Sequence, residues 1–257
     1  MTRKLLACDL DGTLLDRDNV VDPRIVAVFA AGVDIVLVTG RPPRWLWPAA
    51  AALGHHGIAI AANGAVVAAC GKREILSTEA PDLALLSRIR TTVRRHWPEA
   101  AFAVETPEQL YADDTAELGA DALPLEWSAD LVVCKVICRP GRPAARALPL
   151  RRLLAGLVDV HPMSAKPPTY DLRAPGVSKE RALDALCKTR GIDWADVVAI
   201  GDERSDVPML RRAGLGIAMG DGHPAAVAAA DVIAPPFAGE GAATVLARAL
   251  GIALEDG

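Results

Sequence analysis

The sequence predicts an α/β protein in which a doubly wound, mostly parallel sheet forms a core domain that carries a second, inserted α/β domain. Short aliphatic runs alternate with helical patterns at both ends of the chain, as in sheets built from right-handed strand–helix–strand crossovers. Of the 257 residues 51% are hydrophobic but only 4% are aromatic, so the core consists of small aliphatic side chains, which suits parallel strands covered by helices. The middle of the chain interrupts this alternation.

The core is predicted to contain six strands and six helices. Strands are expected at 5–8, 34–39, 58–62, 197–201, 215–218 and 231–234, and helices at 22–31, 42–53, 179–190, 205–213, 223–229 and 239–250. Rossmann-like sheets of this kind bind ligands beyond the carboxyl ends of their strands. Asp9, Thr39, Asn63 and Asp202 stand at or just after such ends. We therefore expect these four side chains to converge on one cleft.

The segment between the two core parts follows a different pattern. It contains helix candidates at 81–97 and near 144–157, with strands near 100–105, 130–138, 158–161 and 168–173. Entry and exit points that lie close together are typical of an inserted domain. The predicted organisation is a core domain formed by 1–76 and 171–257, with an inserted α/β domain at 77–170.

Composition excludes several classes of function. A formal net charge of −4 argues against a general nucleic-acid binder, which needs clustered lysine and arginine. Five cysteines without a C-x-x-C pair favour reduced thiols over a disulfide framework. The chain shows no secretory signal and no apolar run long enough to cross a bilayer. A cytoplasmic protein without membrane partners is therefore expected, and its oligomeric state is unknown.

The stretch "ACDLDGTLLD", residues 7–16, places Asp9 and Asp11 at the end of a buried strand. Buried carboxylates are costly unless a cation or dense donors compensate them. An EF-hand needs glycine at loop position six and glutamate at twelve, whereas Gly12 is at position four and Val20 at twelve. A site with few carboxylates that is open to phosphate and water instead suits Mg²⁺. Gly12 lets the backbone turn so that amides can face an anion.

Four short motifs follow one another along the chain. They are "DLDGTLLD" from Asp9, "VTGR" at 38–41, Lys179 in "GVSKERAL", and "GDERSDVPML" at 201–210. Together they resemble the haloacid dehalogenase superfamily of aspartate-dependent phosphatases. The insertion falls between the second and third motifs, so the chain is similar to the branch with α/β caps, which includes Cof-type sugar phosphatases, phosphomannomutases and trehalose-phosphate phosphatases.

This resemblance implies catalytic roles for particular residues. Asp9 would attack the phosphorus and form an aspartyl-phosphate. Asp11 would protonate the leaving alcohol and later activate water. Mg²⁺ would be held by the carboxylates of Asp9 and Asp202 and by the backbone carbonyl of Asp11. Asp206 would orient Lys179 or a metal-bound water.

The resemblance also implies a set of phosphate and substrate contacts. Thr39, the Gly40 amide and Lys179 would clamp the phosphate oxygens. The remaining candidates for substrate binding are Gly12, Arg41, Asn63 and Gly64. Asn63 and Gly64 resemble a tight hairpin turn as much as a substrate contact. In the inserted domain, the candidates for recognising the rest of the substrate are Glu105, Lys135, Arg139, His161 and Ser164. The sequence does not determine which of these side chains face the core domain.

The resemblance implies a Mg²⁺-dependent phosphomonoesterase that acts on a small phosphorylated metabolite, with a sugar phosphate favoured. Two alternatives remain open. A phosphosugar mutase would return the phosphoryl group to the sugar, and a non-catalytic protein would only bind the phosphorylated ligand. Ser205 and Asp221 stand where Cof-type relatives usually carry asparagine, which leaves open how the rest of the substrate is held.

Overall fold

The computed structural model describes residues 5–15, 20–119, 121–127, 130–141, 147–237 and 241–253. The chain divides into two compact units. Unit 1 comprises Met1–Arg41, Trp45–Leu76 and Ser178–Gly257, and unit 2 comprises Pro42–Arg44 and Ser77–Val177. The second junction therefore follows Val177, whereas the sequence placed it after residue 170. The difference arises because β11 (Pro168–Arg173) pairs with β10 (Asp159–Ala165) and β9 (Lys135–Arg139) of the unit 2 sheet.

Unit 1 is built on an eight-stranded sheet with the order β14-β13-β12-β1-β2-β3-β4-β5. Its strands are β1 (Leu5–Cys8), β2 (Asp34–Val38), β3 (Ile58–Ala61), β4 (Val66–Ala69), β5 (Glu74–Thr78), β12 (Val197–Gly201), β13 (Leu215–Met219) and β14 (Val232–Ala234). Neighbours from β14 to β3 are parallel, and β4 runs antiparallel to β3. The predicted α/β class with a mostly parallel core sheet is confirmed, and β4 and β5 are additions to the expected strands.

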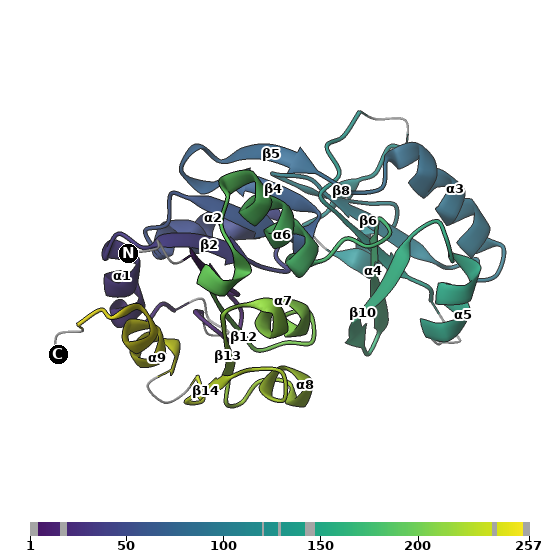
Figure 1. The fold of residues 1–257 in the computed structure, drawn as a ribbon. Helices are drawn as coiled ribbons and strands as arrows, with labels where there is room; N and C mark the ends of the chain where they lie inside the picture. Colours follow the sequence, from purple (N-terminus) through teal and green to yellow (C-terminus); the bar gives the residue numbers. More distant parts are fainter. Residues whose placement is uncertain are drawn as a thin grey trace. The chain divides into compact units, whose positions relative to one another are not determined.

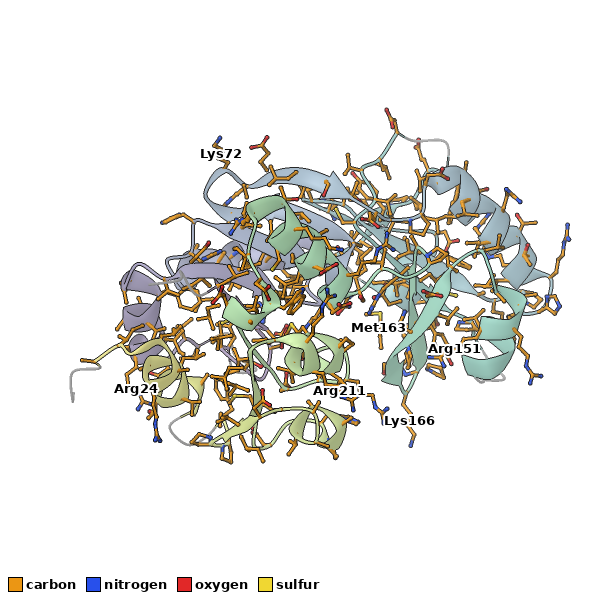
Figure 2. The ribbon with its side chains drawn as sticks, in the orientation of Figure 1. Arg24, Lys72, Arg151, Met163, Lys166 and Arg211 are labelled. Atoms are coloured by element: carbon orange, nitrogen blue, oxygen red, sulfur yellow. The ribbon has the colours of Figure 1, made fainter. Side chains whose placement is uncertain are left out.

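The helices of unit 1 cover the sheet along buried apolar stripes. They are α1 (Pro23–Ala30), α2 (Pro43–Ala52, which enters unit 1 at Trp45), α6 (Lys179–Arg190), α7 (Val207–Arg212), α8 (Pro224–Val227) and α9 (Gly241–Leu250). Leu183 of α6 and Met209 of α7 pack with alternate residues of the central strands, such as Ala7 and Val36. Figure 1 shows α1 and α9 side by side, and these two helices are in contact. The side chain of Lys72 extends away from the ribbon (Figure 2).

Unit 2 is a six-stranded sheet with the order β10-β11-β9-β6-β7-β8. Its strands are β6 (Ala101–Glu105), β7 (Leu110–Ala112), β8 (Leu123–Pro124), β9 (Lys135–Arg139), β10 (Asp159–Ala165) and β11, and its helices are α3 (Leu83–Arg94), α4 (Thr115–Leu118) and α5 (Ala147–Leu153). Leu86 and Ile89 of α3 pack on Phe102 and Val136. The strand expected over 130–138 begins only at Lys135, and residues 144–146 of the expected second helix lie outside the described residues.

The alternation of side chains along each strand shows on which face of the unit 2 sheet most of the candidate recognition residues lie. Phe102 and Val136 point toward α3 and α5, so Glu105, Lys135 and Arg139 lie on the opposite face. Glu105 and Lys135 are directly paired in the β6–β9 ladder, and His161 is paired with Asp171. This face of the sheet is therefore rich in charged side chains. Across the described residues, no helix is both long enough and apolar enough to span a membrane.

Candidate active site

Three carboxylates converge at the carboxyl edge of the unit 1 sheet. Asp9 and Asp202 follow the adjacent parallel strands β1 and β12, so the sheet itself brings them together. Asp206 precedes α7, where it takes the N-cap position. One carboxylate oxygen from each of the three residues lies within 4.8 Å of the others. The predicted convergence of Asp9 and Asp202 is thus present in the fold.

Lys179 joins this cluster from the first turn of α6, directly after the N-cap Ser178. Its Nζ donates to Asp9 Oδ1 at 2.6 Å and to Asp206 Oδ1 at 2.7 Å, and its side chain is only 3% exposed. Burial opposes the ammonium charge, but the carboxylates of Asp206 and Asp9 outweigh it and raise the pKa of Lys179. The residue therefore stays charged over the physiological range.

Burial also controls the titration of the Asp9 carboxylate. Its removal from water raises the pKa of Asp9 well above the ordinary value, and the Lys179 ammonium opposes this shift. An ionised Asp9 is therefore costly in the isolated chain and depends on nearby positive charge. Lys179 supplies one positive charge at this position, and a bound cation would supply another.

Asp206 holds the cluster together through both of its carboxylate oxygens. Oδ1 accepts from Lys179, while Oδ2 accepts from the amides of Asp202 at 3.2 Å and Glu203 at 2.9 Å. A Cβ at Gly201 would lie 2.6 Å from Asp206 Cγ, so glycine is needed for this close approach. The geometry suits a residue that orients Lys179 and shapes the turn after β12. The sequence alone does not indicate this role for Gly201, although the residue opens the fourth motif.

Asp9 and Asp202 fit a divalent cation. One carboxylate oxygen of each lies within 4.8 Å of the other, and two carboxylates this close favour a shared proton or a bound cation. Thr13 Oγ1 donates to Asp202 Oδ1 at 3.3 Å. Gly12 has φ +77°, and a Cβ there would lie 2.6 Å from Asp202 Oδ2. A purely oxygen donor set suits Mg²⁺. Thr13 has no role that the sequence alone indicates, although it lies in the same motif as Asp9.

Asp11 lies apart from these contacts and is bound by Arg41. The Arg41 Nε donates to both Asp11 oxygens at 3.0 Å, and Nη2 also contacts Oδ1. The Asp11 side chain is 56% exposed, whereas that of Arg41 is 14% exposed. The structure thus pairs two residues to which the resemblance assigned separate roles, one in acid–base chemistry and one in substrate binding.

The loop after β2 and the loop after β3 form one hydrogen-bonded unit. Thr39 Oγ1 accepts from the Arg41 amide at 3.1 Å, and an accepting hydroxyl still carries a hydrogen to donate. The Asn63 amide donates to the Thr39 carbonyl at 2.9 Å, and the Ala62 amide donates to the Arg41 carbonyl at 2.8 Å. A Cβ at Gly40 would lie 3.2 Å from Asn63 Oδ1. Four of the predicted site residues therefore share this small region.

Residues 62–65 connect β3 to the antiparallel β4, so the hairpin interpretation of Asn63 and Gly64 is correct for their backbone. Ala62, Asn63 and Gly64 all have positive φ values, of 48°, 57° and 105°. Such strain in non-glycine residues costs free energy and clusters at functional sites. A Cβ at Gly64 would lie 2.2 Å from the Ser178 carbonyl oxygen. The turn is thereby packed against the start of α6, beside Lys179.

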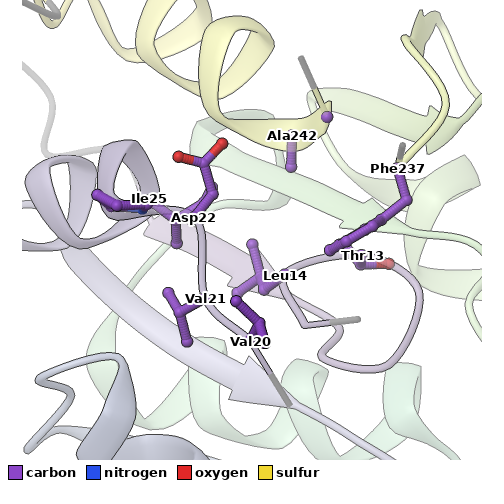
Figure 3. Close-up of a pocket in the computed structure, with 10 residues that line it drawn as sticks. Thr13, Leu14, Val20, Val21, Asp22, Ile25, Phe237 and Ala242 are labelled. Carbon is purple, nitrogen blue, oxygen red and sulfur yellow. The ribbon is translucent and has the colours of Figure 1, made fainter. Parts of the chain in front are cut away.

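A cavity of about 220 Å³ lies beside the loop that follows β1. It is lined by Thr13, Leu14, Val20, Val21, Asp22, Pro23, Ile25, Phe237, Gly241 and Ala242. Figure 3 shows the Phe237 ring reaching toward Thr13 among these mostly apolar residues. Thr13 lines the cavity and also contacts Asp202. The three carboxylates of the cluster and Lys179 are not among the lining residues. The chemistry of the cluster is therefore not available inside this cavity.

Comparisons with known proteins relate this site to one family. The sequence model of a family described as haloacid dehalogenase-like hydrolase matches residues 6–125 and 150–246. The chain is 29% identical over 256 residues to a phosphoglycolate phosphatase of Methanopyrus kandleri, covering 96% of this chain and 97% of that protein. A haloacid dehalogenase-like hydrolase of Bacteroides thetaiotaomicron has a similar structure, with a TM-score of 0.80 and 22% identity over 96% of this chain and 100% of that chain. A haloacid dehalogenase subclass IIB sugar phosphatase shares the fold with a TM-score of 0.74 and 18% identity, covering 97% of this chain and 100% of its own.

Proposed function

Because this chain belongs to the haloacid dehalogenase-like hydrolase family, we propose that it is a Mg²⁺-dependent phosphomonoesterase that acts through an aspartyl-phosphate. The observation that carries the proposal is the buried Asp9 carboxylate, held between the Lys179 ammonium and the Asp202 carboxylate. A carboxylate fixed in this way is positioned to attack a phosphorus atom whose oxygens face Lys179 and the loop of Thr39.

In the first half-reaction, an Asp9 carboxylate oxygen bonds to phosphorus as the bond from phosphorus to the leaving oxygen breaks. Asp11 gives its proton to that leaving oxygen, so the product departs as a neutral alcohol. Lys179 and Thr39 stabilise the charge on the transferring phosphoryl oxygens. When bound by Asp9 and Asp202, Mg²⁺ would supply positive charge that lowers the repulsion between the nucleophile and the phosphate dianion.

In the second half-reaction, water attacks the phosphorus of the aspartyl-phosphate. Asp11, now ionised, takes a proton from this water, and the bond between phosphorus and the Asp9 oxygen breaks. Inorganic phosphate leaves, Asp9 is again a carboxylate and Asp11 is again protonated. Asp206 keeps Lys179 in place through both steps, because its Oδ1 accepts from Nζ while Oδ2 is fixed by two backbone amides.

Two classes of substrate fit this proposal. The four motifs together with the inserted α/β domain favour a sugar phosphate, as in the α/β-capped branch that the sequence resembles. The relative from Methanopyrus kandleri is named a phosphoglycolate phosphatase, which favours a small phosphorylated hydroxy acid. Both are alkyl phosphate monoesters, so the chemistry at Asp9 is the same and only recognition of the leaving group differs.

Phosphate release tests the proposal directly. We expect the protein with Mg²⁺ to release inorganic phosphate from at least one member of a panel of hexose phosphates, pentose phosphates, phosphoglycolate and nucleotides. A kcat/KM above about 10⁴ M⁻¹s⁻¹ for one compound would identify a dedicated substrate. Exchange between hexose 1- and 6-phosphates without phosphate release would instead identify a mutase. Ligand binding without any turnover would contradict the enzyme proposal.

The apparent affinity for Mg²⁺ should fall in acid. Burial, followed by the neighbouring Asp206 carboxylate, raises the pKa of Asp202 to about 6. Because metal binding requires the ionised carboxylate, protons compete with Mg²⁺ below that pH. We expect the half-saturating Mg²⁺ concentration to rise about tenfold or more between pH 7 and pH 5, as measured by calorimetry. An equal affinity at both pH values would contradict this assignment.

A further inference from the structure

We propose that Arg41 is a positioning residue for Asp11, and that it supports catalysis by holding this carboxylate rather than by binding the substrate phosphate. This inference rests on the proposed function and changes the substrate-binding role that the resemblance implies for Arg41. It is drawn from one contact that joins two motifs. The guanidinium of the loop after β2 forms an ion pair with the carboxylate of the loop after β1.

Arg41 is itself firmly placed. Its amide donates to Thr39 Oγ1 at 3.1 Å, and its carbonyl accepts from the Ala62 amide at 2.8 Å. Its side chain is only 14% exposed, so most of it is shielded from solvent. Arg41 can therefore hold a more exposed partner in place.

Asp11 is the more exposed partner of this pair. Its backbone lies in a tight turn, in which the amide of Gly12 donates to the Leu15 carbonyl at 3.0 Å. The side chain, however, is 56% exposed, and an exposed carboxylate samples several rotamers unless something holds it. The forked contact from Arg41 Nε and Nη2 fixes both the position and the plane of the carboxylate. Without Arg41, Asp11 would lose the fixed orientation that proton transfer requires.

The contact with Arg41 still allows Asp11 to transfer a proton. A carboxylate offers about four lone-pair positions, and the guanidinium approaches it from one side. The proton that Asp11 gives to the leaving oxygen, and later takes from water, can occupy a position on the other side. Arg41 Nε and Nη2 contact Asp11, whereas Lys179 Nζ contacts the nucleophile Asp9. Lys179 and Thr39 remain the proposed phosphate clamp.

Leaving-group dependence tests the inference in a way that separates positioning from general damage. Asp11 protonates an alkoxide leaving group, but p-nitrophenolate leaves without this help. We expect Arg41→Gln to lower kcat/KM for the best alkyl phosphate about 100-fold, in line with the usual contribution of a general acid. The loss for p-nitrophenyl phosphate should be smaller than about fivefold. Inhibition by inorganic phosphate should be unchanged, because the phosphate clamp is intact.

A double-mutant cycle separates positioning from phosphate binding. If Arg41 acts through Asp11, adding Arg41→Gln to Asp11→Asn should change kcat/KM by less than about threefold, since residues that act as a unit are not additive. Arg41→Lys keeps the charge without the fork and should recover only part of the loss. Arg190→Gln is the matched control, because Arg190 pairs with Asp34 at 3.1 Å in the same unit, and it should retain wild-type rates.

Three results would overturn the inference. Multiplicative losses in the double variant, together with weaker inhibition by inorganic phosphate, would show that Arg41 binds phosphate. Equal losses for both substrates in a stably folded Arg41→Gln variant would show a purely structural role. No phosphate release by the wild-type protein from either compound would overturn the proposed function and this inference with it, which distinguishes that failure from the first two.

Discussion

Replacing Asp9 with asparagine should abolish phosphate release while leaving the protein folded. The amide has nearly the same shape as the carboxylate, but it cannot act as a nucleophile toward phosphorus. We expect kcat to fall at least about 10⁴-fold, as it does when a nucleophile is removed from other hydrolases. Burial raises the pKa of Asp9, and in this variant Lys179 keeps its ion pair with Asp206 at 2.7 Å, so removing the Asp9 charge should not weaken the fold. Steady-state phosphate release and thermal unfolding, measured on the same preparation, check both parts of this expectation.

Asp9 is also a proposed Mg²⁺ ligand, so loss of activity alone does not establish the nucleophile. A second readout does: acid quenching of the wild-type enzyme during turnover should leave one phosphoryl group on the peptide that carries Asp9, detected as added mass. Asp34→Asn is the control, because Asp34 begins β2 at the opposite end of the strand from Thr39, and this variant should keep wild-type rates. Turnover by Asp9→Asn within tenfold of the wild-type rate would refute the mechanism.

The sequence predicted the core strands well because buried parallel strands are continuous aliphatic runs. β1, β2 and β12 lie within one residue of their expected bounds. β5 was missed because it is an edge strand, largely exposed and polar, and such strands lack the apolar pattern that marks a buried strand. In unit 2, β7 and β8 span three and two residues, too few to show a period. The resemblance to the haloacid dehalogenase family is confirmed by the family match.

The site was predicted as a set of residues but not as a set of contacts. Parallel strands bring Asp9 and Asp202 to one edge, which is why strand ends alone located them. Side-chain pairings across loops follow no such rule. The contact of Asp11 with Arg41 and the contact of Thr13 with Asp202 depend on how two turns approach each other. The sequence therefore indicates which residues gather in this region, but not which side chains contact one another there.

Replacing Lys179 with methionine should cause the largest loss of stability of any single change at the site. Methionine fills a similar volume but leaves Asp9 and Asp206 buried, at 4% and 0% exposure, without their shared ammonium partner. Breaking a buried ion pair in this way costs about 3–5 kcal/mol in the free energy of unfolding. Urea denaturation at neutral pH measures it. Lys188→Met is the matched control on the same helix, because the Lys188 side chain is 74% exposed where it pairs with Asp184, and it should cost less than about 1 kcal/mol.

The pH dependence of that loss identifies its cause. An acid whose pKa is raised in the folded state binds more protons when folded than when unfolded, so its ionisation destabilises the fold as pH rises through the interval between the two values. Burial gives Asp9 such a raised pKa, which Lys179 opposes. Without Lys179 the cost of the ionised Asp9 carboxylate is greatest at neutral pH, and its protonation relieves that cost in acid. The difference in stability between wild type and Lys179→Met should therefore shrink from pH 7 to pH 5, whereas a loss of packing alone would give the same difference at both pH values.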